Sequence, residues 1–145
     1  MKIVLQRVKK AVVEVKGQQI SSISKGLLLF LGIAKNDGEE QLNWLAKKII
    51  GLRIFEDEDG KMNRSIIDIS GEILLISQFT LCADCKKGRR PSFDKAALPK
   101  LAEKYYLQFA DKLNEFGIKP QLGVFGAEME IDLVNDGPVT IILER

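Results

Sequence analysis

Residues Gly26–Ala34 read GLLLFLGIA, an uninterrupted apolar run. A strand with one solvated face alternates apolar and polar side chains, whereas a strand covered on both faces is apolar throughout. The run therefore predicts a central strand of a sheet. Shorter stretches rich in β-branched residues, separated by a Gly17-Gln18 turn, predict strands upstream of it at Ile3–Val8, Ala11–Val15 and Ile20–Ser24.

Two segments downstream have the apolar spacing of helices. The first follows Glu40 and ends at Gly51, and the second begins near Pro99, because proline is favoured in the first helical turn, and ends at Gly117. The apolar stripe of the first is Leu42, Leu45, Ala46, Ile49 and Ile50, and that of the second is Ala102, Tyr105, Phe109, Leu113 and Phe116.

The remaining apolar segments predict further strands, and no internal repeat or linker divides the chain. We therefore expect one α+β domain over residues 1–145, with a mostly antiparallel, barrel-like sheet and two main helices. The further strands are expected at Leu52–Phe55, Ile66–Ile69, Glu72–Leu81, Gln121–Phe125, Met129–Val134 and Val139–Leu143.

Composition sets the general class of the protein. The 145 residues are 46% hydrophobic and 29% charged with a net charge of +2, so any affinity for nucleic acid must come from local clustering. No apolar run approaches the roughly 20 residues that span a membrane. The start resembles no signal peptide, and two cysteines three positions apart make no secreted disulfide framework. We expect a cytoplasmic protein with no membrane partner.

The chain contains no histidine. A Ser-His or Cys-His nucleophile pair and a histidine-bound metal are therefore excluded. An enzyme with this sequence must use hydroxyls, carboxylates, lysines, backbone dipoles or groups of its substrate, and we expect no cofactor and no metal.

Polar residues Ser77, Gln78 and Thr80 interrupt the apolar segment Glu72–Leu81. In a regular strand, Ser77 and Phe79 would face one way and Gln78 and Thr80 the other. An unpaired buried polar group costs about 1–3 kcal/mol. Either these residues line a cleft, or the strand ends at the surface before a polar loop.

A second unusual segment is Asn135–Thr140 (NDGPVT), which lies between apolar residues typical of strands. Proline removes a donor from a sheet and is confined to edges, bulges and turns. Glycine reaches backbone angles that other residues avoid. Gly137-Pro138 therefore predicts a kink with exposed carbonyls, which is either a tight turn or a device for contacting another molecule.

Taken together, these segments resemble the D-aminoacyl-tRNA deacylase family along essentially the whole chain. The resemblance rests on motifs in the family's order, which is more specific than any single motif. They are Gln6-Arg7-Val8, Leu52-Arg53-Ile54-Phe55, Gly60-Lys61-Met62-Asn63, Ser77-Gln78-Phe79-Thr80-Leu81, Lys87-Gly88-Arg89-Arg90-Pro91-Ser92-Phe93 and Asn135-Asp136-Gly137-Pro138-Val139-Thr140.

The resemblance implies a homodimeric hydrolase whose substrate is tRNA with a charged 3′ end. Such an enzyme cleaves the ester between a D-amino acid and the terminal adenosine, and it also clears mischarged glycine. The family carries a cis Gly-Pro bond that enters the active site of the partner subunit. By resemblance, Gly137 and Pro138 hold the amino group and exclude an L side chain.

The resemblance also implies a catalytic segment, Ser77, Gln78, Phe79 and Thr80. A threonine hydroxyl is a weak nucleophile without a neighbouring base, so we expect backbone N–H groups near Phe79 and Thr80 to bind an oxyanion. The 2′-hydroxyl of the terminal ribose would orient or activate water. Met129 and Phe125 resemble family positions that line the substrate pocket, although both residues also fit an ordinary core.

Lys86, Lys87, Arg89 and Arg90 form the densest basic cluster. Such a run is commonly a solvated loop, but beside an RNA site it predicts contacts with tRNA phosphates. The alternative is a non-catalytic nucleic-acid-binding dimer, which the basic cluster and the missing histidine both favour.

Cys82 and Cys85 form a C-x-x-C motif, which is typical of a redox pair or half of a zinc site. No further cysteine or histidine completes a tetrahedral site within one chain. Because cysteines at these positions depart from the family pattern, we interpret them as incidental.

Overall fold

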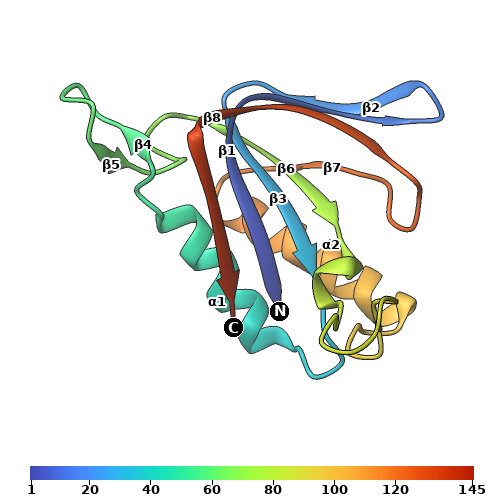
Figure 1. Cartoon of the computed structure of the whole chain (residues 1–145). Helices are drawn as coiled ribbons and strands as arrows, with labels where there is room; N and C mark the ends of the chain where they lie inside the picture. Colours follow the sequence, from blue (N-terminus) through green and yellow to red (C-terminus); the bar gives the residue numbers. More distant parts are fainter.

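The computed structural model describes residues 1–145 and contains a curved mixed sheet whose one face is covered by two helices (Figure 1). The helices are α1 (Glu39–Gly51) and α2 (Pro99–Glu115). The strands and one short 3₁₀ helix are β1 (Lys2–Val15), β2 (Gln18–Ile23), β3 (Gly26–Gly32), β4 (Phe55–Glu56), β5 (Met62–Arg64), β6 (Glu72–Ser77), η1 (Phe79–Cys82), β7 (Gln121–Leu122) and β8 (Glu130–Glu144).

The main sheet has the order β2-β1-β3-β6-β7, and β8 pairs with β1. The β1 pairs with β2, β3 and β8 are antiparallel, whereas the β3–β6 and β6–β7 pairs are parallel. The first half of β1 lies between β3 and β8, and its second half lies between β2 and β8. The expected α+β fold with two helices and a barrel-like sheet is confirmed.

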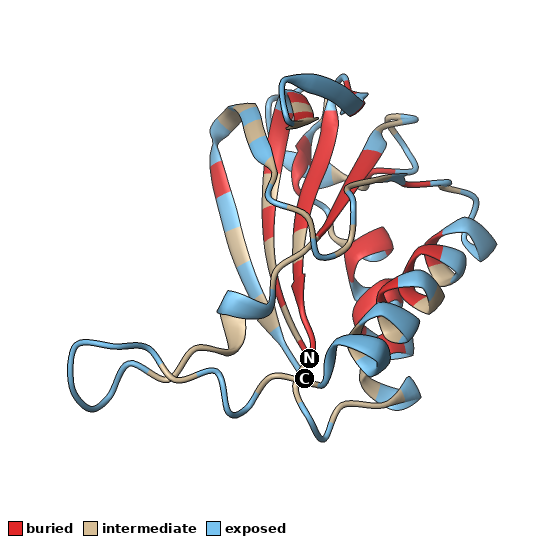
Figure 2. Ribbon diagram, turned by 90° about the vertical axis from the view of Figure 1, so that its right-hand side faces the viewer, coloured by how far each residue is buried: buried red, intermediate tan, exposed pale blue.

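β3 is the central strand that its apolar sequence predicts. All of its residues except Phe30 are buried, because helices cover one face and the curled sheet covers the other (Figure 2). The larger core, which contains Leu27 and Leu29, packs under α1 and α2. The smaller core, which contains Leu28 and Leu74, lies on the opposite face of the sheet.

Several sequence-based strand assignments are wrong. The expected strand Leu52–Phe55 forms only from Phe55, where β4 begins. The two strands expected before Gly17 are one continuous strand, β1, and the two expected around Gly137-Pro138 are one continuous strand, β8. The expected strand Ile66–Ile69 is a turn, because the Ser70 and Gly71 amides bond back to the Ile67 and Ile66 carbonyls. The small hairpin of β4 and β5 includes a strand, Met62–Arg64, that the sequence reading missed.

Helix α2 buries Phe109 and Leu113 of the predicted stripe, and Ala102 and Tyr105 are partly covered. The prediction was wrong for Phe116, which is exposed, and it omitted Tyr106, which is buried. The Tyr106 hydroxyl donates a 2.8 Å hydrogen bond to the Leu75 carbonyl of β6. Burial raises the pKa of Tyr106 above its ordinary value. This buried contact fixes α2 against the strand that leads into Ser77.

Candidate active site

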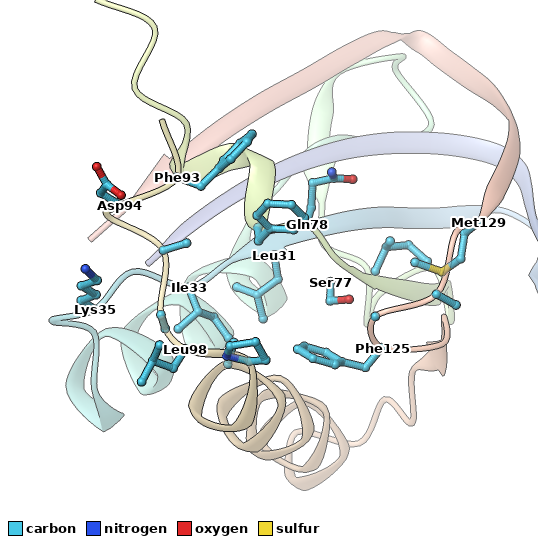
Figure 3. A pocket seen from close by; sticks show the side chains of 18 of the residues that line it. Leu31, Ile33, Lys35, Ser77, Gln78, Phe93, Asp94, Leu98, Phe125 and Met129 are labelled. Carbon is cyan, nitrogen blue, oxygen red and sulfur yellow. The ribbon is translucent and has the colours of Figure 1, made fainter. Parts of the chain in front are cut away.

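An open cleft of about 680 Å³ lies where β3 and β6 end (Figure 3). Parallel neighbours end at the same edge of a sheet, and here Leu31 of β3 pairs with Ser77 of β6. The start of α2 contributes Leu98 and Pro99. The opposite side is the segment between β7 and β8, which contributes Phe125, Gly126, Ala127 and Met129.

Five of the predicted site residues line this cleft: Ser77, Gln78, Phe79, Phe125 and Met129. Lys35 and Asp94 lie at one end of the cleft, and Met129 lies at the other end (Figure 3). The cleft is therefore mostly apolar, with a few polar groups at defined places, as is common for sites that bind small organic groups.

The expected strand Glu72–Leu81 ends at Ser77, so the predicted alternation of Ser77 to Thr80 across a strand is wrong. The neighbouring strand β3 ends at Gly32. The last hydrogen bond between the two strands is donated by the main-chain amide of Gln78 to the Leu31 carbonyl at 2.8 Å. The chain then turns into η1, in which the Leu81 amide bonds to the Gln78 carbonyl at 3.2 Å.

This turn leaves two backbone donors free. The amides of Phe79 and Thr80 begin η1 and have no acceptor within the chain, as is general for the first residues of a helix. The Gln78 side-chain amide donates to the Thr80 hydroxyl oxygen at 2.5 Å. Thr80 is exposed, does not line the cleft and hydrogen-bonds to no base.

The rim of the cleft is aromatic and unusually exposed. Phe79 is 58% exposed and lies edge-on to Phe93, with ring centroids 5.0 Å apart. Leu98 is 72% exposed. Sequence reasoning missed Phe93 and Leu98 as cleft residues. The signal for Phe93 was a large apolar side chain in an otherwise polar loop, and Leu98 directly precedes α2.

Gly32 sets how closely η1 approaches the sheet. A Cβ atom at Gly32 would lie 2.8 Å from the Leu81 Cβ and 3.0 Å from the Gln78 carbonyl oxygen. Only glycine permits this approach of η1 to β3.

The Gly137–Pro138 peptide bond is cis, and both residues are exposed in the middle of β8. Neither residue lines the cleft of its own chain. Gly137 has φ +132°, a conformation that residues with a side chain rarely adopt. Gly137 and Pro138, which we call the Gly-Pro corner, are therefore exposed on β8 and lie outside the cleft that contains Ser77.

The side chain of Arg7 contacts the Gly-Pro corner through Asp136 and is buried, with only 3% of the residue exposed. Its Nε donates to the Asp136 carbonyl at 3.0 Å and lies 3.4 Å from the Asp136 carboxylate. Its Nη1 donates to the Ile54 carbonyl. The sequence signal for this role was a charged residue inside the apolar strand Ile3–Val8.

Comparison with known proteins identifies the group to which this arrangement belongs. The family model described as D-Tyr-tRNA(Tyr) deacylase matches residues 4–144. The chain belongs to this family. The resemblance inferred from the sequence motifs is confirmed, and with it the prediction of a hydrolase of the deacylase kind.

Relatives named D-aminoacyl-tRNA deacylase match over nearly their whole length. The Thermosipho africanus protein is 52% identical over 99% of this chain and 97% of its own. The Exiguobacterium sibiricum protein is 54% identical over 100% of both chains. These matches include all the segments that form the cleft and the Gly-Pro corner.

Two solved structures have the same fold as this deacylase. One, described as "c-Myc DNA Unwinding Element Binding Protein", is 44% identical with a TM-score of 0.94 and covers 100% of this chain and 99% of its own. The other, described as a probable eukaryotic D-amino acid tRNA deacylase, is 15% identical with a TM-score of 0.81 and covers 98% and 97%. At that identity the second match shows the fold alone.

The basic cluster of the deacylase lies in the exposed loop after η1, which extends away from the body of the molecule (Figure 2). Lys86, Lys87, Arg89 and Arg90 are all exposed, and none of them lines the cleft or forms an ion pair. The structure therefore separates the predicted RNA-contacting residues from the cleft by the length of this loop.

Both cysteines are free thiols. Partial burial raises the pKa of Cys82, whereas Cys85 is exposed. No group of three or more histidine, cysteine, aspartate or glutamate side chains is placed to hold a metal ion. Neither α1 nor α2 has the length and apolar composition that a membrane-spanning helix requires.

Proposed function

We propose that this chain removes D-amino acids, and mischarged glycine, from the 3′ end of tRNA by hydrolysing the ester to the terminal adenosine. Membership in the deacylase family over residues 4–144 is the observation that carries this proposal. The cleft of about 680 Å³ is within the range of about 300–1,000 Å³ that is usual for small-molecule sites, so it has room for an aminoacyl-adenosine. Residues 1–145 act as a single domain, and the reaction takes place in the cytoplasm.

The free amides of Phe79 and Thr80 bind the oxygen that becomes negatively charged when water attacks the ester. Donors fixed in this way are worth about 2.7–4 kcal/mol each in hydrolases of comparable chemistry. Thr80 is not the nucleophile, because its hydroxyl oxygen already accepts the Gln78 amide and no base contacts it. The substrate's own 2′-hydroxyl positions the attacking water, while Ser77 and Gln78 shape the pocket.

Chirality is read by Gly137 and Pro138 of a second copy. Both residues are exposed on β8 and absent from the cleft of their own chain, so a partner has to bring their carbonyls to the ester. They accept hydrogen bonds from the substrate amino group, and their bulk leaves no space for an L side chain. The working form on this proposal is a homodimer whose cleft is completed by its partner.

Lys86, Lys87, Arg89 and Arg90 bind phosphates of the tRNA acceptor stem. Contacts with phosphate carry no base information, which suits an enzyme that must accept many tRNAs.

The decisive experiment compares hydrolysis of D-Tyr-tRNA, L-Tyr-tRNA and Gly-tRNA by the purified protein. We expect rapid release of D-tyrosine and glycine, with the L ester left at its spontaneous rate. Equal rates for both tyrosyl esters would contradict the proposed chirality selection. Spontaneous rates for all three esters would contradict the proposed hydrolase activity. A substrate ending in 2′-deoxyadenosine tests the role of the ribose, and we expect it to be resistant.

A second candidate is nucleic-acid binding without turnover, which the exposed basic loop favours. The solved structure that is 44% identical to this chain carries the name of a DNA-unwinding-element binding protein. Tight binding of single-stranded DNA or uncharged tRNA without ester hydrolysis, unaffected by Gly137→Ala, would favour this candidate over the deacylase.

A further inference from the structure

The loop between η1 and α2 has two parts with different surroundings. Residues 93–97 run along the cleft and include four residues that line it, Phe93, Asp94, Ala96 and Ala97, of which Phe93 and Asp94 are labelled in Figure 3; we call this segment the cleft wall. Residues 85–91 (CKKGRRP) form an exposed arm that carries four cationic and no acidic side chains. We define this segment as the basic arm.

Asp84 and Ser92 close the base of the basic arm. The Asp84 amide donates to the Ser92 carbonyl at 2.8 Å, and the Ser92 amide donates to the Asp84 carbonyl at 3.0 Å. These reciprocal bonds form an isolated antiparallel bridge. The arm therefore leaves and re-enters the body of the protein at one fixed point.

The Asp84 carboxylate connects the two parts of the loop. One oxygen, Oδ1, accepts the amide of Lys86 at 3.0 Å, within the basic arm. The other, Oδ2, accepts Nζ of Lys95 at 3.0 Å, within the cleft wall. These contacts lower the pKa of Asp84, chiefly through the Lys86 amide and then through Lys95. One side chain thus contacts both the arm and the wall.

The cleft wall is itself fixed to the sheet side of the cleft. The Lys35 amide donates to the Lys95 carbonyl at 3.0 Å, and the Ala97 amide donates to the Ile33 carbonyl at 2.9 Å. Ala34 and Ala96 form a second isolated bridge between these segments. Hydrogen bonds therefore connect the segment that follows β3 to Lys95, Lys95 to Asp84, and Asp84 to the Lys86 amide in the basic arm.

We propose that Asp84 is a positioning residue that holds the basic arm at a set distance from the cleft, so that one tRNA reaches both. This inference rests on the proposed function and extends it. The ion pair between Asp84 and Lys95 is largely solvated, with side chains 30% and 68% exposed, and such pairs add little to folding stability. Its effect is on where the arm's cations stand relative to the ester, since Asp84 bonds both to the Lys86 amide of the arm and to Lys95 beside the cleft.

The test is Asp84→Asn, which keeps the size of the side chain and removes its charge. D-Tyr-tRNA has both an ester and phosphates, whereas D-tyrosyl-adenosine has the same ester and no phosphate. We expect KM for D-Tyr-tRNA to rise roughly fivefold with kcat unchanged, and both constants for D-tyrosyl-adenosine to stay as in the unaltered protein. The slope of log KM for D-Tyr-tRNA against log salt should decrease by about one, as for the loss of one phosphate contact.

Lys95→Gln tests the same connection from the other side, and Lys95→Arg should restore the unaltered KM because it keeps the ion pair. Asp111→Asn is the matched control, since Asp111 is exposed on α2 and forms no ion pair. An unchanged KM for D-Tyr-tRNA in Asp84→Asn would overturn the proposal. An equal loss on D-tyrosyl-adenosine would also overturn it, because Asp84 would then act on the cleft itself.

Failure of the proposed function gives a different result. In that case the unaltered protein hydrolyses neither ester, and equilibrium binding of uncharged tRNA replaces KM as the measurement. Weaker tRNA binding by Asp84→Asn than by Asp111→Asn still supports the positioning role, and equal binding overturns it.

Discussion

The guanidinium of Arg7 on β1 donates a 3.0 Å hydrogen bond to the main-chain carbonyl of Asp136, the residue directly before the Gly137-Pro138 corner. Arg7 also bonds to the Ile54 carbonyl beside the β4–β5 hairpin. The buried Arg7 side chain therefore connects the Gly-Pro corner to β1 and to the segment that precedes β4.

Arg7→Met should lower both stability and activity. It leaves the Asp136 and Ile54 carbonyls without their charged donor, which corresponds to about 1.5–3 kcal/mol of free energy of unfolding. Urea denaturation measures this loss, and turnover of D-Tyr-tRNA relative to L-Tyr-tRNA measures the disturbance of the corner. Arg53→Met is the control, because Arg53 is exposed and forms no ion pair. Equal stability of the two variants would contradict the role of Arg7.

Gly137→Ala should abolish most D-specific turnover while the protein stays folded. The alanine Cβ would lie 2.8 Å from the Val139 Cγ2 and 3.0 Å from the Arg7 Nη2, at a φ of +132° that alanine avoids. Displacement of the corner by about 1 Å corresponds to a loss of about 100-fold in rate. Gly51→Ala is the matched control, since open space surrounds that position. Full activity of Gly137→Ala would show that the corner does not contact the substrate.

Gly32→Ala should separate η1 from the sheet. Overpacking of this kind costs about 1–3 kcal/mol, and here the added methyl would displace Leu81 and the Gln78 carbonyl. Because the free amides of Phe79 and Thr80 move with η1, kcat for D-Tyr-tRNA should fall by more than the change in KM. A variant with reduced stability and normal kcat would exclude the Phe79 and Thr80 amides from catalysis.

Cys85 should react with iodoacetamide well before Cys82. The thiolate is the reactive form, and partial burial raises the pKa of the Cys82 thiol while Cys85 is exposed. Mass spectrometry of the digested protein at timed intervals measures which cysteine is alkylated first. In Cys85→Ser only Cys82 can react, so this variant gives the rate of the slower site. First labelling at Cys82 would contradict the structure around η1.

Tyr106→Phe should cost about 1 kcal/mol near neutral pH, because the Leu75 carbonyl loses its buried hydroxyl donor. The pKa of Tyr106 is raised by burial, so above pH 10 the unfolded chain loses this proton before the folded protein does. The contribution of Tyr106 is therefore complete below that pH and declines above it. Denaturation of both proteins from pH 7 to 11 should show the difference between them narrowing as the pH rises.

The parts of this molecule that follow from local sequence were predictable. An all-apolar run identified β3, and helical spacing identified α1 and α2. The polar residues that interrupt Glu72–Leu81 had two interpretations, a cleft or the surfacing end of a strand. Both apply: Ser77 and Gln78 line the cleft, and Thr80 lies in the exposed η1 that follows the end of β6.

The parts that depend on distant segments were not predictable. The strand β6 ends at Ser77 because the neighbouring strand β3 ends beside it at Gly32. The local sequence of β6 contains no information about where β3 ends. β8 stays continuous through Pro138 because β1 pairs with it on both sides of the corner. Arg7 and Asp84 act across 129 and 11 positions of sequence, to Asp136 and Lys95 respectively, so their partners could be found only in three dimensions.

The position of Gly137 and Pro138 outside their own cleft has a consequence for mixed populations of chains. On the proposed arrangement, a chain with a damaged corner and a chain with a damaged cleft would each be impaired alone. Pairing one of each would reunite an intact corner with an intact cleft in one of the two sites. Co-expression of Gly137→Ala and Gly32→Ala should therefore give more activity than either variant gives separately, and dilution should reduce it as the pairs dissociate.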